Sequence, residues 1–147
     1  MKTPINQVTA KFTAISENEC FARTLAVNFA AQASPTVSQL ADIKCAVSEA
    51  VTNCIVHAYK DTVGTVTLGM KRYSDGLIVI TVRDSGVGIP DVEAAKEPLF
   101  TTDTTGERSG MGFAIMESMT DSMSVRSASG KGTTVTMKIK VGTYGRK

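Results

Sequence analysis

The side chains best suited to phosphoryl transfer fall on one helical stripe. Glu49, Asn53 and His57 are spaced four residues apart, so an α-helix would bring them onto the same face. A carboxylate there could accept a proton from an attacking hydroxyl, and an amide oxygen could ligate Mg²⁺. An acid and an amide at this spacing are also common on solvent-exposed helix faces. For the pair alone, an exposed face without a catalytic role is favoured over a catalytic site by about ten to one.

A second motif, Asp84-Ser85-Gly86-Val87-Gly88-Ile89, directly follows a predicted strand. Its two glycines let the backbone bend close to a flat ligand, and Asp84 is a candidate buried acceptor for the amino group of adenine. For a lone motif of this kind, a tight turn in which Asp84 caps backbone amides is favoured over an adenine-binding role by about two to one.

A third motif, Gly110-Met111-Gly112-Phe113, opens a predicted helix, with Arg108 shortly before it. Unpaired amides and the positive end of the helix dipole can face phosphate oxygens at such a position. The spacing is that of neither a P-loop nor a dinucleotide-binding Rossmann fingerprint, so a different ATP-binding fold is required.

A fourth motif, Gly132-Thr133, begins the last predicted strand. The Thr133 hydroxyl could hydrogen-bond Asp84 or a bound base. A hairpin turn would by itself account for the glycine, so this dipeptide says little alone.

Hydrophobic periodicity and turn residues predict the elements that position these motifs. Ser16 and Glu19 fit a capping box at the start of the first helix, and Gly76 should adopt positive φ in a hairpin turn. Strands grouped in hairpins with helices between the groups predict an α+β two-layer sandwich, a mostly antiparallel mixed sheet covered on one face by helices. We expect strands at 8–14, 64–73, 77–83, 124–129 and 133–141, and helices at 16–33, 38–59 and 113–123.

The segment 84–110 is long for a connection without strands or long helices inside a compact domain. Segments of this kind are commonly active-site lids. We therefore expect a lid at about 90–109 within a single domain spanning 1–147.

Composition limits the classes of function. The chain has no apolar run near the roughly 20 residues of a membrane helix and no signal-peptide pattern, so we expect a cytoplasmic protein. Its 16 basic and 14 acidic residues are scattered, without the basic block typical of nucleic-acid binding. One histidine excludes most zinc hydrolase sites, and three widely spaced cysteines indicate buried reduced thiols, not a disulfide framework.

Taken in order, four motifs resemble the N, G1, G2 and G3 boxes of the GHKL superfamily of ATPases and kinases. The resemblance covers about residues 5–140, and 17–23, 98–102 and 107–113 are similar to the sporulation anti-sigma factors of that superfamily. Four motifs in this order outweigh the plainer interpretation of each one. The motifs are Glu49-Ala50-Val51-Thr52-Asn53, Asp84-x-Gly86-x-Gly88, Gly110-Met111-Gly112 and Gly132-Thr133.

The resemblance implies the Bergerat fold and a serine/threonine protein kinase that uses ATP and releases ADP. In it Asp84 would recognise adenine, Asn53 would hold Mg²⁺ and Glu49 would act as the base. It also implies a homodimer that sequesters a sporulation sigma factor and phosphorylates a serine of an anti-anti-sigma protein, with Arg23 contacting a partner. The nucleotide site would further include His57, Gly86, Gly88, Ile89, Thr101, Arg108, Gly110, Met111, Gly112, Phe113 and Thr133.

Other functions within this superfamily are weighed against the same residues. The sequence His57-Ala58-Tyr59 is similar to stress-response anti-sigma kinases, which leaves the sigma partner open. A sensor histidine kinase would need a phosphoacceptor histidine on a dimerisation helix, whereas His57 lies in the helix of the nucleotide site. A gyrase-like or Hsp90-like ATPase would need transducer segments beyond this length. A nucleotide-gated sigma-binding module without kinase activity is disfavoured by Glu49.

Overall fold

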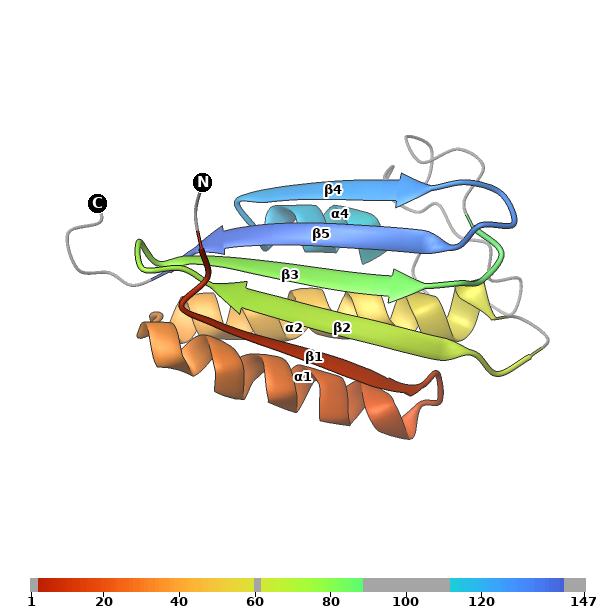
Figure 1. The fold of residues 1–147 in the computed structure, drawn as a ribbon, viewed down its shortest axis with the longest axis horizontal. Helices are drawn as coiled ribbons and strands as arrows, with labels where there is room; N and C mark the ends of the chain where they lie inside the picture. The colour runs from red at the N-terminus through yellow and green to blue at the C-terminus, as the bar shows by residue number, and fades with distance from the viewer. Residues whose placement is uncertain (1–2, 60–61, 89–111, 142–147) are drawn as a thin grey trace.

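The computed structural model describes residues 3–59, 62–88 and 112–141, which form two layers (Figure 1). One layer is a five-stranded sheet of order β1-β2-β3-β5-β4, in which each strand pairs with its neighbours in antiparallel fashion. The helices lie on one face of it, which confirms the predicted α+β sandwich. The elements are β1 (Asn6–Thr13), α1 (Glu17–Ala30), a 3₁₀ turn (Ala31–Ala33), α2 (Val37–Asn53), a π-helical turn (Cys54–Ala58), β2 (Thr65–Arg72), β3 (Leu77–Asp84), α4 (Gly112–Ser118), β4 (Ser122–Ser127) and β5 (Thr133–Lys140).

The hydrophobic core lies between the sheet and the helices. Ile78, Ile80 and Val82 alternate along β3 and are fully or almost fully buried, as the period of two predicts for a strand with one covered face. Val47 and Val51 on α2 belong to the same buried cluster. Apolar burial of this kind is the main stabilising contribution to the fold, at about 25 cal/mol per Å² removed from water.

Helix α2 begins with a capping box that the sequence analysis missed. The Gln39 amide donates to the Thr36 hydroxyl oxygen at 3.0 Å, and the Thr36 amide donates to the Gln39 side-chain oxygen at 2.9 Å. The capping box predicted for α1 is wrong: Ser16 has helical backbone angles and makes no side-chain cap bond. The Glu19 carboxylate instead accepts hydrogen bonds from Arg23 and from Ser48 on α2.

The second helix does not stay α-helical to residue 59 as expected. It changes at Cys54 into a π-helical turn, a rare form that recurs at functional sites. The last helix is also shorter than the predicted 113–123, because it ends at Ser118 and β4 already begins at Ser122. The Thr120 hydroxyl donates to the Met116 carbonyl at 2.9 Å, and such side-chain bonds compete with continuation of a helix.

Two glycines of the β4–β5 turn allow a matched test of how tightly β5 packs at its start. Gly130 and Gly132 have nearly equal positive φ, 77° and 80°. A Cβ at Gly132 would lie 2.3 Å from the Asp84 carbonyl oxygen, whereas a Cβ at Gly130 would have nothing within 4 Å. Gly130→Ala should therefore cost about 1 kcal/mol of left-handed strain, and Gly132→Ala at least about 3 kcal/mol because a backbone atom must also move.

Urea unfolding of the two variants beside the unmodified chain measures both costs. Equal losses of unfolding free energy would show that the close approach of Gly132 to Asp84 is not a constraint on the fold.

Candidate active site

The end of α2 and the first residue of α4 meet around Glu49, Asn53 and Gly112. A Cβ at Gly112 would lie 3.1 Å from Asn53 Nδ2 and 3.2 Å from its Oδ1. The same Cβ would lie 3.3 Å from Glu49 Oε1, so a side chain at Gly112 would crowd both groups. The structure therefore brings Gly112, the first residue of α4, together with the Glu49 carboxylate and the Asn53 amide of α2. Helical spacing predicted only that Glu49 and Asn53 share a stripe, and the resemblance to the family predicted that Gly112 joins them.

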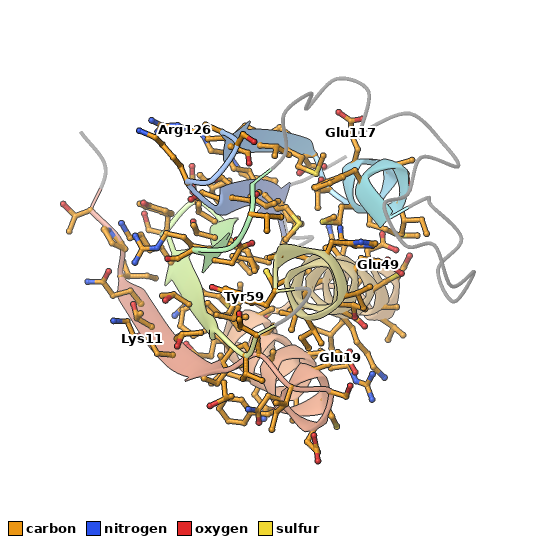
Figure 2. All side chains as sticks on the ribbon, turned by 90° about the vertical axis from the view of Figure 1, so that its right-hand side faces the viewer. Lys11, Glu19, Glu49, Tyr59, Glu117 and Arg126 are labelled. Carbon is orange, nitrogen blue, oxygen red and sulfur yellow. The ribbon has the colours of Figure 1, made fainter. Side chains whose placement is uncertain are left out.

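The core-facing stripe of α2 determines where these two polar side chains point. Ala46, Val47 and Ala50 are buried in the hydrophobic cluster, so Glu49 and Asn53 lie at the margin of that stripe and remain half-buried. Figure 2 places Glu49 on the side of α2 nearest α4. The half-buried Glu49 carboxylate, beside Asn53 and the buried Gly112, keeps access to solvent and to a ligand. A fully buried acid would lose that access.

Asp84 is a buried carboxylate at the end of β3, with 7 % of its surface exposed. Its Oδ1 accepts the Gly86 amide at 2.9 Å, which confirms that it caps a backbone turn. Its Oδ2 accepts the Cys54 thiol of the π-helical turn at 3.4 Å. Each carboxylate oxygen has a second lone pair, so Asp84 can still accept a hydrogen bond from a ligand.

Cys54 is the partner of Asp84 that the sequence analysis missed. Burial, the nearby Asp84 charge and the hydrogen bond to Asp84 raise the pKa of the Cys54 thiol well above its ordinary value. The thiol therefore stays protonated and donates to the carboxylate. All three cysteines are free, as predicted, but Cys20 is exposed and Cys45 half-exposed, so the expected burial holds for Cys54 alone.

The loop after Asp84 is attached to the π-helical turn. The Val87 amide donates to the Ala58 carbonyl at 3.0 Å, and the Ser85 amide donates to the Tyr59 hydroxyl oxygen at 2.7 Å. A Cβ at Gly86 would lie 2.2 Å from that same Ala58 carbonyl oxygen, so glycine is required for this approach. The wider π turn thus holds the glycine loop close to the end of α2.

The opposite side of this loop contacts the β4–β5 turn. The Gly130 amide donates to the Val87 carbonyl at 2.6 Å. Gly88 has φ of 79°, and a Cβ there would lie 1.9 Å from the Ala128 carbonyl oxygen. The loop is therefore held between two separate elements, which fixes the position of Asp84.

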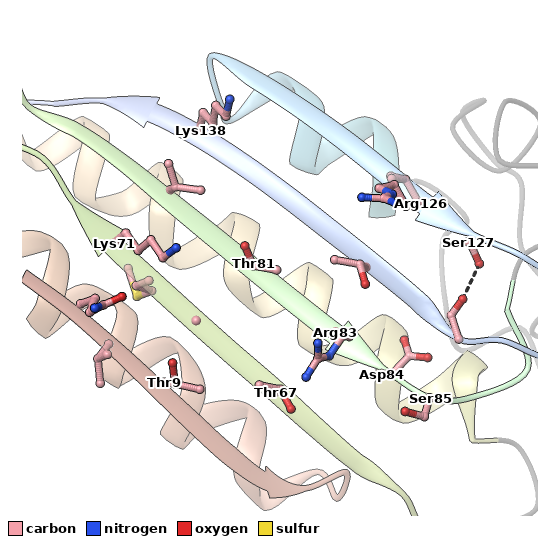
Figure 3. Close-up of a pocket in the computed structure, with 18 of the residues that line it drawn as sticks. Thr9, Thr67, Lys71, Thr81, Arg83, Asp84, Ser85, Arg126, Ser127 and Lys138 are labelled. Carbon is pink, nitrogen blue, oxygen red and sulfur yellow. Dashed lines mark hydrogen bonds between the residues drawn. The ribbon is translucent and has the colours of Figure 1, made fainter. Parts of the chain in front are cut away.

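Thr133 is buried and stands directly across from Asp84 in the β3–β5 pairing. Its hydroxyl shares a hydrogen bond of 2.8 Å with the Ser127 hydroxyl, in place of the predicted bond to Asp84. The Ser127 hydroxyl also donates to the Gly132 carbonyl at 2.9 Å, the bond that Figure 3 draws as a dashed line. His57 lies half-buried in the π-helical turn, and Phe113 packs against the core from α4.

Several predicted site residues cannot be placed. Ile89, Thr101, Arg108, Gly110 and Met111, and with them the expected lid at 90–109, lie outside the described residues.

Arg23 lies on α1, where its Nη1 atom is 3.0 Å from Glu19 Oε1. Both side chains of this i,i+4 pair are partly buried, and the Glu19 carboxylate also accepts a hydrogen bond from Ser48.

The described part of the chain holds no group of three or more His, Cys, Asp or Glu side chains suited to a metal. None of its helices is long and apolar enough to cross a membrane.

The comparisons with known proteins agree with this architecture. A family model described as a histidine kinase-like ATPase domain matches residues 13–139. The RsbU and RsbW domains of a Mycobacterium tuberculosis protein align with a TM-score of 0.67 at 20 % identity, over 94 % of this chain and 32 % of that one. The catalytic domain of histidine kinase ThkA aligns with a TM-score of 0.53 at 17 % identity, over 91 % and 96 %. These two likenesses show the fold.

The sequence relatives are closer. The anti-sigma F factor of Caldanaerobacter subterraneus subsp. tengcongensis is 50 % identical, over 93 % of this chain and 95 % of the relative. The anti-sigma F factor of Geobacillus kaustophilus is 52 % identical, over 90 % and 91 %. Together with the ATPase domain match, this places the chain in the anti-sigma F factor family, within the histidine kinase-like ATPase domains.

Proposed function

We propose that this chain is an anti-sigma factor that binds a sporulation sigma factor and uses ATP to phosphorylate a serine of an anti-anti-sigma protein. The observation that carries the kinase part is the approach of Gly112 to both Glu49 and Asn53. It joins a candidate base, a candidate metal ligand and a helix start at one place. The names of its relatives support the sigma-factor part.

ATP is proposed to bind between the end of α2 and the loop after β3. Asp84 would accept the adenine amino group, because its carboxylate is buried and fixed by Cys54 and Gly86. Buried polar groups of this kind discriminate strongly between ligands, since the wrong ligand leaves them unpaired. The phosphates would then extend toward Gly112 and the end of α2.

In the proposed transfer, the partner's serine oxygen forms a bond to the γ-phosphorus and the bond between that phosphorus and the β-γ bridging oxygen breaks. Glu49 accepts the serine proton, and ADP leaves with the bridging oxygen. Glu49 is suited to this because it is half-buried and lies beside Gly112. The helix amides supply positive potential where phosphate charge gathers.

Mg²⁺ is proposed to bind through Asn53. Mg²⁺ commonly takes one or two protein oxygens and completes its octahedron with phosphate oxygens and water, so a single amide oxygen can be its protein ligand. The Asn53 amide oxygen lies near the start of α4, on the side where the phosphates are proposed. When bound, the ion would neutralise charge on the phosphate oxygens.

Partner binding is proposed to involve Arg23, whose partly exposed guanidinium on α1 could exchange Glu19 for a carboxylate on another protein. We also propose that the protein acts in the cytoplasm and as a homodimer, by likeness to the family.

The test is incubation of the chain with ATP, Mg²⁺ and an anti-anti-sigma protein, followed by intact-mass measurement. One added phosphoryl group on the partner, absent when its candidate serine is replaced by alanine, is the expected result. ATP binding without any transfer would contradict the kinase and favour a nucleotide-gated sigma-binding module. Co-purification of a sporulation sigma factor, compared with a stress-response sigma factor, tests the choice of sigma partner separately.

A further inference from the structure

Tyr59 directly follows the π-helical turn, and its partly buried ring packs against the core beside the end of α2 (Figure 2). Its hydroxyl donates to the Thr65 carbonyl at 2.9 Å and accepts the Ser85 amide at 2.7 Å. Thr65 is the first residue of β2, and Ser85 is the first residue after β3. One side chain therefore connects the end of a helix, the start of one strand and the loop that leaves another.

The Tyr59 hydroxyl takes the place of one hydrogen bond in the β2–β3 pairing. In that register Val66 stands opposite Asp84, so the next pair along the two strands would be Thr65 and Ser85. In an antiparallel pair such residues can bond directly, amide to carbonyl. Here the tyrosine oxygen stands between the Ser85 amide and the Thr65 carbonyl, and two bonds in series replace one. The strands therefore separate directly after Asp84, where Figure 3 shows Ser85 leaving the sheet.

The backbone after Asp84 is fixed mainly by the end of the π-helical turn. The amides of residues 85–87 donate, in that order, to the Tyr59 hydroxyl, to Asp84 Oδ1 and to the Ala58 carbonyl. Two of the three acceptors thus come from adjacent residues, and the Tyr59 hydroxyl holds the amide next to Asp84. Because that acceptor is a side-chain atom, a substitution can remove it and leave the backbone unchanged.

Gly64 provides the space for the Tyr59 ring. A Cβ at Gly64 would lie 2.2 Å from both Cε1 and Cζ of the ring, closer than such atoms can approach. Gly64 is not one of the glycines with positive φ, so the ring, and not the backbone conformation, requires glycine at this position. A methyl group there would displace the ring and carry its hydroxyl away from Thr65 and Ser85.

We propose that Tyr59 is a positioning residue for nucleotide recognition, whose hydroxyl fixes the backbone beside Asp84 so that the carboxylate faces the amino group of adenine. The inference rests on the proposed function, in which Asp84 recognises adenine. A buried acceptor discriminates between ligands only where it is held in place, because hydrogen bonds weaken steeply with poor geometry. Glu49 lies on α2 before the π-helical turn, so the transfer step itself should not depend on this hydroxyl.

The experiment is titration calorimetry of the full chain with ATP and with GTP in the presence of Mg²⁺. Tyr59→Phe keeps the ring and removes only the hydroxyl oxygen. Gly64→Ala is a second test variant, which displaces the hydroxyl without removing it. The matched control is Tyr73→Phe, which removes a tyrosine hydroxyl just beyond the opposite end of β2. Thermal unfolding checks that every variant is folded at the temperature of the titration.

We expect Tyr59→Phe to weaken ATP binding about fivefold. GTP binding should change less than about twofold, because guanine carries a carbonyl where adenine carries its amino group. Gly64→Ala should lower the preference for ATP in the same direction, and Tyr73→Phe should leave both affinities within about twofold. In phosphotransfer by Tyr59→Phe, KM for ATP should rise about fivefold while the rate at saturating ATP stays within about twofold.

A lower thermal midpoint of Tyr59→Phe with an unchanged ratio of ATP to GTP affinity would overturn the positioning role and leave the hydroxyl a support of the sheet alone. Proportional weakening of both nucleotides would overturn it as well. Failure of the proposed function has a different signature. An unmodified chain that binds ATP no more tightly than GTP would overturn the adenine assignment of Asp84, and the role of Tyr59 with it.

Discussion

Glu49→Gln is expected to lower phosphotransfer to the partner serine about a thousandfold, while ATP affinity stays within about twofold. Glutamine has nearly the shape of glutamate, so its contacts beside Gly112 are kept, but its amide cannot take the serine proton. Single-turnover transfer measured with saturating ATP separates the chemical step from nucleotide binding.

Glu117→Gln provides the matched control. Glu117 lies on the neighbouring helix α4 and is exposed, and the same change there removes one negative charge without touching the proposed base. Its transfer rate should stay within about twofold of the unmodified chain, because exposed charges act weakly through solvent. If both variants lost transfer equally, or if Glu49→Gln kept it, Glu49 would not be the base.

Asp84→Asn is expected to weaken ATP binding about a hundredfold. The amide that replaces one carboxylate oxygen would point a donor at either the Gly86 amide or the Cys54 thiol, each of which is already a donor. A lost buried acceptor costs about 1–3 kcal/mol, and 1.4 kcal/mol is a factor of ten in affinity. Titration calorimetry with ATP and with GTP measures the change.

The ratio of the ATP and GTP affinities distinguishes recognition of adenine from general damage to the site. Asp84→Asn should bring that ratio close to one, because the acceptor for the adenine amino group is lost. Cys54→Ala keeps the carboxylate and removes its thiol donor, so its ratio should keep the preference for ATP with a smaller loss of affinity. Proportional loss of ATP and GTP in Asp84→Asn would contradict the adenine assignment.

The sequence predicted the features that depend on local periodicity. The alternation along Ile78, Ile80 and Val82 and the turn at Gly76, which has φ of 93°, are properties of neighbouring residues, and the structure confirms them. The shared stripe of Glu49 and Asn53 follows from helical spacing alone. Their meeting with Gly112 was predicted by likeness to the family, since spacing cannot bring α4 against α2.

Features that depend on packing between distant elements were not predicted. The hydrogen bond from Cys54 to Asp84 requires a π-helical turn, and no residue pattern in 54–58 distinguishes that turn from a continued α-helix. The capping box predicted at Ser16 is absent, because the Glu19 carboxylate accepts hydrogen bonds from Arg23 on α1 and Ser48 on α2 instead. The gathering of lysines and arginines on the open face of the sheet was not predicted, because these residues are scattered along the chain and come together only through strand register.

The sheet also determines when this protein can fold during its synthesis. Strand β1 is made first, yet its partner is β2, with Thr13 facing Thr65 and Asn6 facing Arg72. Contacts between residues so far apart in the chain close late, because a long loop must be ordered before they contribute. Until the ribosome has released β2, β1 has no neighbour and the apolar side of α1 has no sheet to cover it. The growing chain therefore exposes an unpaired strand edge while α1 and α2 are being made, and such edges are prone to aggregation until their partner strand arrives.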